Sequence, residues 1–151
     1  MMKFIALIVF SLNLASTLAT PIKRDILFKV DADNSGDFKN VPIYKVPEHT
    51  QVFSVGGDDG YKVTFTLKDD TTMVDQDGDA VYINSDSGEV GNTKAYHDVD
   101  PSAGFSVKDG RLYFNDNQQW KACPTGDGRY SLTSNYDCDG ASEITLFIAS
   151  S

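Results

Sequence analysis

The segment Gly104–Ile148, GFSVKDGRLYFNDNQQWKACPTGDGRYSLTSNYDCDGASEITLFI, decides the fold. It contains the only tryptophan, Trp120, and both cysteines of the chain. Apolar and polar residues alternate on either side of Asp109-Gly110, and this pattern predicts a hairpin because Asp and Gly tolerate the positive φ of a type I′ turn. The same period of two recurs in two later runs, at residues 130–132 and 144–148. The segment is therefore expected to form a β-meander.

Short alternating runs separated by turn residues also fill the chain before this segment. The clearest runs from Tyr61 to Leu67, whereas residues 41–46, with prolines at 42 and 47, are expected as an edge strand or an extended segment. Turn signals recur at short intervals, and convincing helical periodicity is missing after residue 25. The sequence predicts a single all-β domain, a small β-sandwich or barrel, with a trefoil as a further alternative.

The N-terminal residues have the pattern of a secretory leader. Residues 1–19 combine Lys3, an apolar run and small residues up to Ala19, which is typical of a signal peptide. The run is too short to span a membrane, which takes about 20 residues; a buried N-terminal helix is the alternative. Residues 20–24 end in Lys23-Arg24, which indicates a short pro-segment cut after a dibasic pair or, alternatively, an ordinary charged flank. The secreted β domain would then cover residues 25–151.

The charge balance is strongly acidic. The chain has 13 Lys and Arg against 22 Asp and Glu, for a net charge of −9. Removing residues 1–24 takes away three bases and no acid, so ten bases remain and the net charge becomes −12. Such a surface repels nucleic acid and anionic membranes, and neither is expected as a partner. Nineteen of the acids are Asp, a residue that favours turns.

The two cysteines are expected to form one disulfide, Cys123–Cys138, because secreted chains are oxidised. Closing a loop of this length stabilises a domain by about 3 kcal/mol in the chain-entropy model. His49 and His97 lie far apart in the sequence and lack the paired spacing of zinc ligands. We expect no metal or other cofactor, apart from one weak calcium candidate.

This calcium candidate comprises Asp31, Asp33, Ser35 and Asp37, whose oxygens alternate along the chain as in the first half of a calcium loop. The bidentate Glu of an EF-hand is replaced by Pro42, and helical flanks are missing. An Asp-rich turn is the simpler interpretation. Residues 75–79, with the sequence DQDGD, are a weaker calcium candidate of the same kind, and an Asp-rich turn is again the simpler interpretation.

Four aromatic residues are candidates for contact with sugar rings: Trp120, Tyr113, Tyr130 and Tyr136. For Trp120 the favoured alternative is packing in the core beside the disulfide. Tyr113 and Tyr82 fall out of phase with the apolar face of their strands and are expected to be exposed. Neither a nucleophile with a matched base nor a singled-out pair of carboxylates points to catalysis, so no catalytic residue is assigned.

Several motifs resemble fungal cell-wall proteins, namely the phialide type and the C-terminal domain of the Pir mannoproteins. The resemblance covers roughly residues 67–148, and its motifs are DGD at 77–79, GFSV at 104–107, DGRL at 109–112, ACPT at 122–125, GRY at 128–130 and DC at 137–138. The chain lacks the Gln-containing repeats that attach Pir proteins covalently to β-1,3-glucan, and it lacks their additional cysteines. Only Cys123 and Cys138 carry over, as a structural bridge.

This resemblance implies a non-catalytic secreted protein that is structural or associates with cell-wall polysaccharide, either glucan or chitin. A secreted effector or toxin-like interaction protein is the alternative from a different class. An enzyme acting on wall glucan is the third hypothesis.

Overall fold

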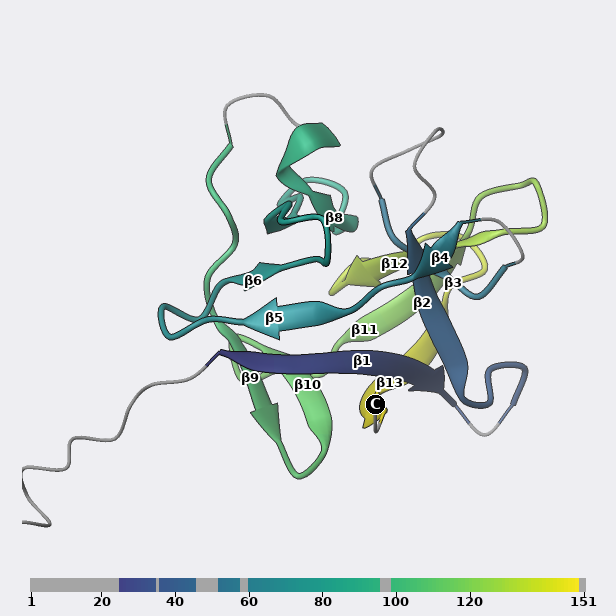
Figure 1. Ribbon diagram of the computed structural model, residues 1–151. Coiled ribbons are helices and arrows are strands. Elements are labelled where there is room, and N and C mark those ends of the chain that lie inside the picture. The colour runs from purple at the N-terminus through teal and green to yellow at the C-terminus, as the bar shows by residue number, and fades with distance from the viewer. Residues whose placement is uncertain (1–24, 35, 46–51, 58–59, 96–98, 150–151) are drawn as a thin grey trace, which may run out of the picture.

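The computed structural model describes residues 25–34, 36–45, 52–57, 60–95 and 99–149. The expected signal peptide and pro-segment, with Ala19, Lys23 and Arg24, lie outside these residues, as does Ser35. Short strands and one 3₁₀ turn, η1 (Thr93–Ala95), make up the fold (Figure 1). The strands are β1 (Ile26–Asp33), β2 (Val41–Lys45), β3 (Ser54–Val55), β4 (Tyr61–Lys62), β5 (Phe65–Leu67), β6 (Met73–Val74), β7 (Val81–Ile83), β8 (Val90–Asn92), β9 (Phe105–Lys108), β10 (Arg111–Phe114), β11 (Trp120–Pro124), β12 (Tyr130–Ser134) and β13 (Ser142–Ala149). The expected all-β fold is confirmed.

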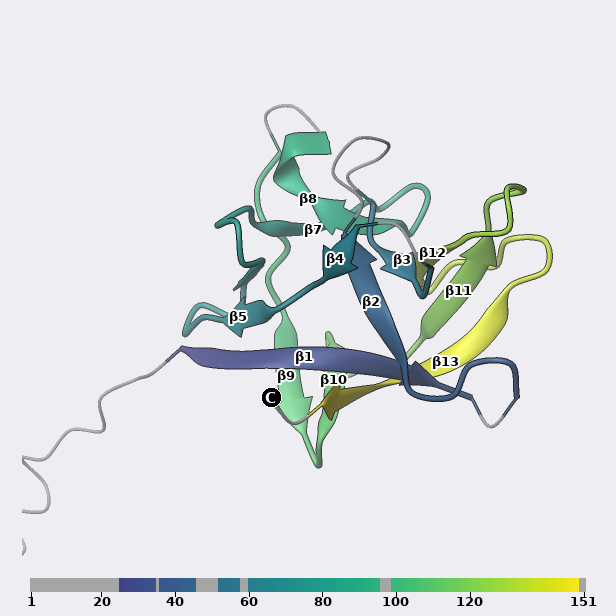
Figure 2. The same cartoon turned by 45° about the vertical axis from the view of Figure 1, so that its right-hand side comes forward.

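Six strands close into a barrel in the order β1-β2-β3-β12-β11-β13, and all of their pairings are antiparallel. The closing pair joins the first strand to the last, with Val30 opposite Ile148 and Ala32 opposite Leu146. Figure 2 shows β1 and β13 crossing the lower part of the molecule together. Of the expected alternatives, the barrel is the form observed.

Hairpins extend the barrel on two sides. The β9–β10 hairpin joins β13 through Arg111 and Phe147, and its turn residues Asp109 and Gly110 have φ of 52° and 73°. This is the predicted Asp-Gly turn. The β5–β6 hairpin joins β1 through Ile26 and Leu67. The β7–β8 pair forms a separate two-stranded sheet at the top of Figure 1.

Alternating residues of the barrel strands fill its interior, because successive side chains of a strand point to opposite faces. Trp120 is 1% exposed, and its indole N–H donates a hydrogen bond to the Leu112 carbonyl at 2.9 Å. Phe53 packs edge-on against Phe65, with 5.4 Å between ring centroids. The rest of this core includes Phe28, Val30, Ala32, Ile43, Val55, Ala122, Leu132, Ile144 and Leu146.

Two strand predictions need correction. The run from Tyr61 to Leu67 is not one strand, because the side chain of Gln76 bonds to the backbone at Lys62 and Thr64 and the chain changes partners there. β4 consequently pairs with β2, and β5 pairs with β1. The predicted edge strand is instead the barrel strand β2, which pairs with β1, β3 and β4.

Candidate functional site

The Cys123–Cys138 disulfide is confirmed, with 6.1 Å between the Cα atoms. Cys123 lies on β11 and is buried, while Cys138 lies in the loop between β12 and β13. Because Trp120 and Ala122 point into the barrel, the alternation of the strand directs Cys123 to the opposite face. The Trp120 ring is in the core, as expected, and it lies on the face of β11 opposite to that of Cys123. The bridge fixes the loop that carries Asn135 to Asp137.

Residues of this loop line two adjoining clefts, which together form what we call the amide groove. The first has a volume of about 340 Å³, the second about 580 Å³, and they share Gln119 and Asn135. The lining of the first includes five side-chain amides and one exposed tyrosine: Asn84, Asn115, Asn117, Gln119, Asn135 and Tyr136. The second adds charged groups and further amides: Asp33, Asn34, Gln118, Lys121, Asp137 and Glu143.

The local backbone holds the groove asparagines in defined positions. Asn115 and Asn135 have left-handed φ values of 51° and 52°, a conformation that asparagine tolerates better than most residues. The Asn135 N–H donates to the Gln119 carbonyl at 2.7 Å, and the Asn115 N–H donates to the Gly104 carbonyl at 2.9 Å. Turns from separate parts of the chain are thereby tied together at the groove floor.

Gly88 allows the turn after β7 to approach Tyr136 closely. Its φ is +71°, and a Cβ atom placed there would lie 2.5 Å from the Tyr136 Cβ and 2.8 Å from the Ser134 carbonyl oxygen. The Ser134 N–H donates to the Gly88 carbonyl at 2.8 Å. A side chain at position 88 would push the Tyr136 wall of the groove outward.

Of the four aromatic residues expected to contact sugar, only Tyr136 is an exposed wall of the groove, at 40% exposure. Trp120 borders the second cleft, but its ring is buried. Tyr113 is half-buried rather than exposed, as is Tyr82; the Tyr113 hydroxyl accepts a hydrogen bond from Gln118 at 3.0 Å. Tyr130 is half-buried and packs edge-on against Phe38, with 5.1 Å between ring centroids.

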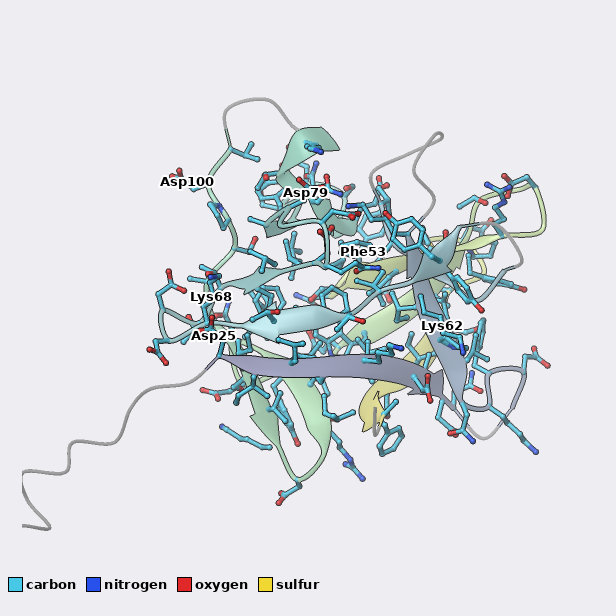
Figure 3. All side chains as sticks on the ribbon, in the orientation of Figure 1. Asp25, Phe53, Lys62, Lys68, Asp79 and Asp100 are labelled. Atoms are coloured by element: carbon cyan, nitrogen blue, oxygen red, sulfur yellow. A yellow bond between two sulfur atoms is a disulfide. The ribbon has the colours of Figure 1, made fainter. Side chains whose placement is uncertain are left out.

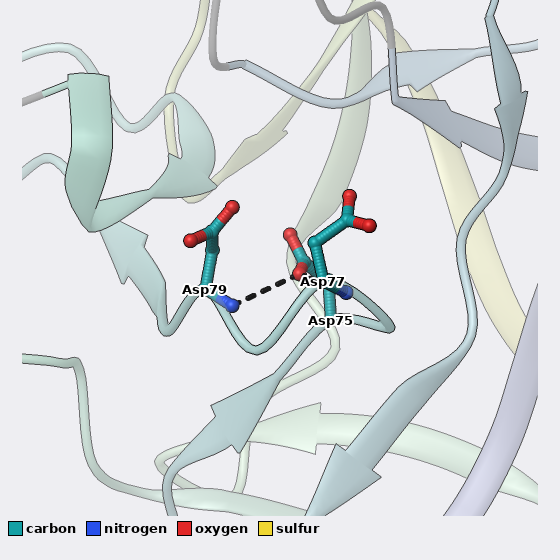
Figure 4. A group of neighbouring side chains, drawn as sticks. All are labelled: Asp75, Asp77 and Asp79. Atoms are coloured by element: carbon teal, nitrogen blue, oxygen red, sulfur yellow. Dashed lines mark hydrogen bonds between the residues drawn. The ribbon is translucent and has the colours of Figure 1, made fainter.

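A second polar cluster surrounds Lys45. This lysine follows Ile43 on the inner face of β2 and is 5% exposed. Its ammonium lies 2.6 Å from Asp75, 3.1 Å from Asp77 and 2.9 Å from Asp79. The three carboxylates come from one tight turn, in which the Asp75 Oδ1 accepts the N–H groups of Asp77 and Asp79 (Figure 4).

The pKa shifts of this cluster follow from its pairing. Burial alone would lower the pKa of Lys45, but its hydrogen bonds to the three carboxylates outweigh that effect and raise it. The hydroxyl of Tyr61 donates to Asp77, and this bond, together with that from Lys45, lowers the Asp77 pKa. Burial opposes ionisation of Asp79, but bonds from Lys45 and Lys94 lower its pKa. The cluster is an internally paired set of ionised groups.

Within the described residues, the carboxylates of these three aspartates lie close enough together to share a cation. Their oxygens face the Lys45 ammonium, so a side chain supplies the positive charge there. Asp79 lies just before β7, on the side of the molecule that carries the β7–β8 pair (Figure 3). The sequence had identified this segment as an Asp-rich turn and as the weaker of two calcium candidates.

The stronger calcium candidate, at residues 31–37, is arranged differently from the three aspartates around Lys45. Asp31 and Asp33 lie on β1, opposite Phe147 and Thr145, and Asp37 is exposed in the following loop. Within that loop, the side-chain oxygen of Asn34 accepts the N–H groups of Gly36 at 2.9 Å and Phe38 at 3.1 Å. An asparagine-centred turn therefore shapes the segment.

Comparison with family models, curated proteins and solved structures found no match for this chain. Within the described residues, the structure contains no helix long and apolar enough to cross a membrane. The site is therefore judged on its own geometry. Sequence reasoning identified Tyr136 and the disulfide but missed the groove amides, because they come from turns that meet only in the fold.

Proposed function

We propose that this protein is a secreted, non-catalytic component of a fungal cell wall or its surroundings, and that it binds polysaccharide non-covalently through the amide groove. The observation that carries the proposal is the convergence of Asn84, Asn117, Gln119 and Asn135 with the exposed Tyr136 around one open cleft. A side-chain amide has both a donor and an acceptor, which suits sugar hydroxyls. The Asn84 oxygen already accepts the Asp86 and Ser87 N–H groups, and the Asn117 amide already donates to the Asn115 carbonyl. An exposed tyrosine offers an apolar face for a sugar ring.

The rest of the molecule supports a passive role. The barrel interior is filled by side chains, so an open polar surface is the feature left for recognition. The disulfide suits an oxidising compartment, which agrees with the expected leader. The resemblance to Pir and phialide-type cell-wall proteins points the same way. Without the Pir repeats, attachment would rest on contacts of the groove.

Retention on insoluble polysaccharide tests this proposal. Purified protein is incubated with β-1,3-glucan, chitin or cellulose beads, and the bound fraction is measured for the parent and for Tyr136→Ala. The matched control is Phe147→Ala, because Phe147 is exposed to a similar degree, 36% against 40%, but does not line the groove. We expect retention on glucan or chitin to fall about tenfold for Tyr136→Ala, as for loss of a stacked aromatic ring, and to stay unchanged for Phe147→Ala.

Three results would contradict the proposal. Equal retention of both variants would remove the groove from the binding surface, and release of soluble sugar would favour an enzyme acting on glucan. Failure to bind any wall polymer, combined with activity on foreign cells, would favour the effector hypothesis.

A further inference from the structure

The second cleft of the amide groove differs from the first in its charge. Of its described lining residues, Asp33, Asp137 and Glu143 are acidic and Lys121 is basic. The described lining of the first cleft adds Asp86, which is also acidic. Acidic groups therefore outnumber basic ones among the described residues of the groove.

The fold directs these charges outward on neighbouring strands. Trp120, Ile144 and Ala32 point into the barrel, so the adjacent residues Lys121, Glu143 and Asp33 point to the outer face. Lys121 lies directly opposite Glu143 in the β11–β13 ladder, and Asp33 is opposite Thr145 in the β13–β1 ladder. Glu143 of β13 and Asp33 of the neighbouring strand β1 thus both lie along the cleft.

Lys121 is less exposed than the carboxylate with which it pairs. Its ammonium pairs with Asp137, and its side chain is only 15% exposed, whereas the Asp137 side chain is 89% exposed. The carboxylates of Asp137 and of the exposed Glu143 consequently lie toward the solvent, and the ammonium of Lys121 is less exposed than either residue. A ligand entering the cleft meets a negative potential, and the acidic chain as a whole reinforces it.

We propose that the groove selects a polymer containing amino sugars with free, positively charged amines, such as chitosan or partly deacetylated chitin. The amides and Tyr136 of the first cleft hold the sugar ring and its hydroxyl or acetamido groups. The exposed Glu143 carboxylate of the second cleft, with the exposed Asp137 carboxylate nearby, pairs with the ammonium group of a neighbouring unit. This inference rests on the proposed function and adds the class of polysaccharide. A cationic peptide would satisfy the carboxylates but would make less use of the amide-lined half.

Retention on chitosan, chitin, β-1,3-glucan and polylysine beads tests the inference, at about pH 5.5, where carboxylates are ionised and amines are protonated. We expect the parent to be retained most strongly on chitosan. Glu143→Gln should weaken chitosan binding roughly two- to fivefold while leaving chitin binding unchanged, and added salt should weaken only chitosan binding. Tyr136→Ala should weaken binding to both sugar polymers and leave polylysine binding unchanged.

The matched control is Asp109→Asn. This substitution also removes one negative charge, but from an exposed residue of the β9–β10 turn, and asparagine tolerates the φ of 52° at this position. An equal effect of Glu143→Gln and Asp109→Asn on chitosan would overturn the inference in favour of general charge attraction. Retention on chitin and glucan with no preference for chitosan would also overturn it, but would leave the proposed function intact. Stronger retention on polylysine, insensitive to Tyr136→Ala, would assign the groove to a cationic peptide. Retention on none of the sugar polymers would contradict both proposals.

Discussion

The molecule contains two polar regions, the Lys45 cluster and the amide groove, and they use their polar groups in different ways. In the Lys45 cluster, the ammonium is buried and three carboxylates of one turn surround it. In the amide groove, side chains from several turns face an open cleft. A buried polar group must be paired inside the protein, whereas one that faces solvent can exchange water for a ligand. We therefore expect the first region to stabilise the fold, and the second is the region to which we propose that polysaccharide binds.

The largest effect is expected for Lys45→Met, which removes the positive charge and leaves the nearly fully buried Asp75 without its ion-pair partner. Removing one partner of a buried pair typically costs about 3–5 kcal/mol of unfolding free energy. Urea unfolding of the parent and the variant measures this loss. Any protein that remains folded should still bind polysaccharide.

Two further variants sharpen that prediction. Adding Asp75→Asn to Lys45→Met should recover part of the stability, because the side-chain oxygen that accepts the turn N–H groups is kept while the unpaired charge is removed. Lys108→Met is the matched control, since its ion pair with Asp116 lies on the surface and should contribute little. If Lys45→Met were as stable as the parent, the structural role of the cluster would be wrong.

The second effect concerns the disulfide, which fixes the loop that forms one wall of the groove. Replacing Cys123 and Cys138 together by serine should lower the unfolding free energy by about 3 kcal/mol. Retention on polysaccharide should also fall at temperatures where the variant is still folded, because Tyr136 lies two residues before Cys138. Thermal unfolding and retention are measured side by side. Unchanged retention would show that the bridge does not position the groove.

The smallest effect on unfolding free energy is expected for alanine substitutions at two glycines with positive φ. Gly88→Ala combines backbone strain with overlap against Tyr136 and Ser134, while a Cβ at Gly126 would meet nothing within 4 Å. Alanine at Gly126 should therefore cost about 1 kcal/mol, and alanine at Gly88 more than this. Only the Gly88 variant should lose polysaccharide retention. Equal losses for both variants would contradict the proposed contact with the tyrosine wall.

The barrel was predictable from the sequence where local chemistry sets the structure. The Asp109-Gly110 hairpin needs only a turn with positive φ between alternating strands, and the disulfide follows from two cysteines in an oxidised chain. The break between β4 and β5 could not be predicted, because it depends on the side chain of Gln76, which is distant in the sequence. The position of β2 inside the barrel could not be predicted either, because it depends on pairing with β1, β3 and β4.

The candidate site was less predictable than the fold. Tyr136 was chosen as one of several aromatic residues, but only the fold distinguishes it from the half-buried Tyr113 and Tyr130. Asn84, Gln119 and Asn135 come from three separate turns, so their convergence has no signal in local sequence. Lys45 carried one signal that was overlooked: it lies two residues after Ile43, on the same face of a strand.

A two-dimensional amide NMR titration of the ¹⁵N-labelled parent with soluble glucan, chitin and glucosamine oligosaccharides tests the central claim most directly. Our account predicts that shifts concentrate on both the backbone and side-chain amides of Gln119, Asn135 and their neighbours in the groove. Signals from β2 around Lys45 and from the turn at residues 75–79 should stay in place. Shifts centred on that turn, or no shifts with any of the three oligosaccharides, would contradict it.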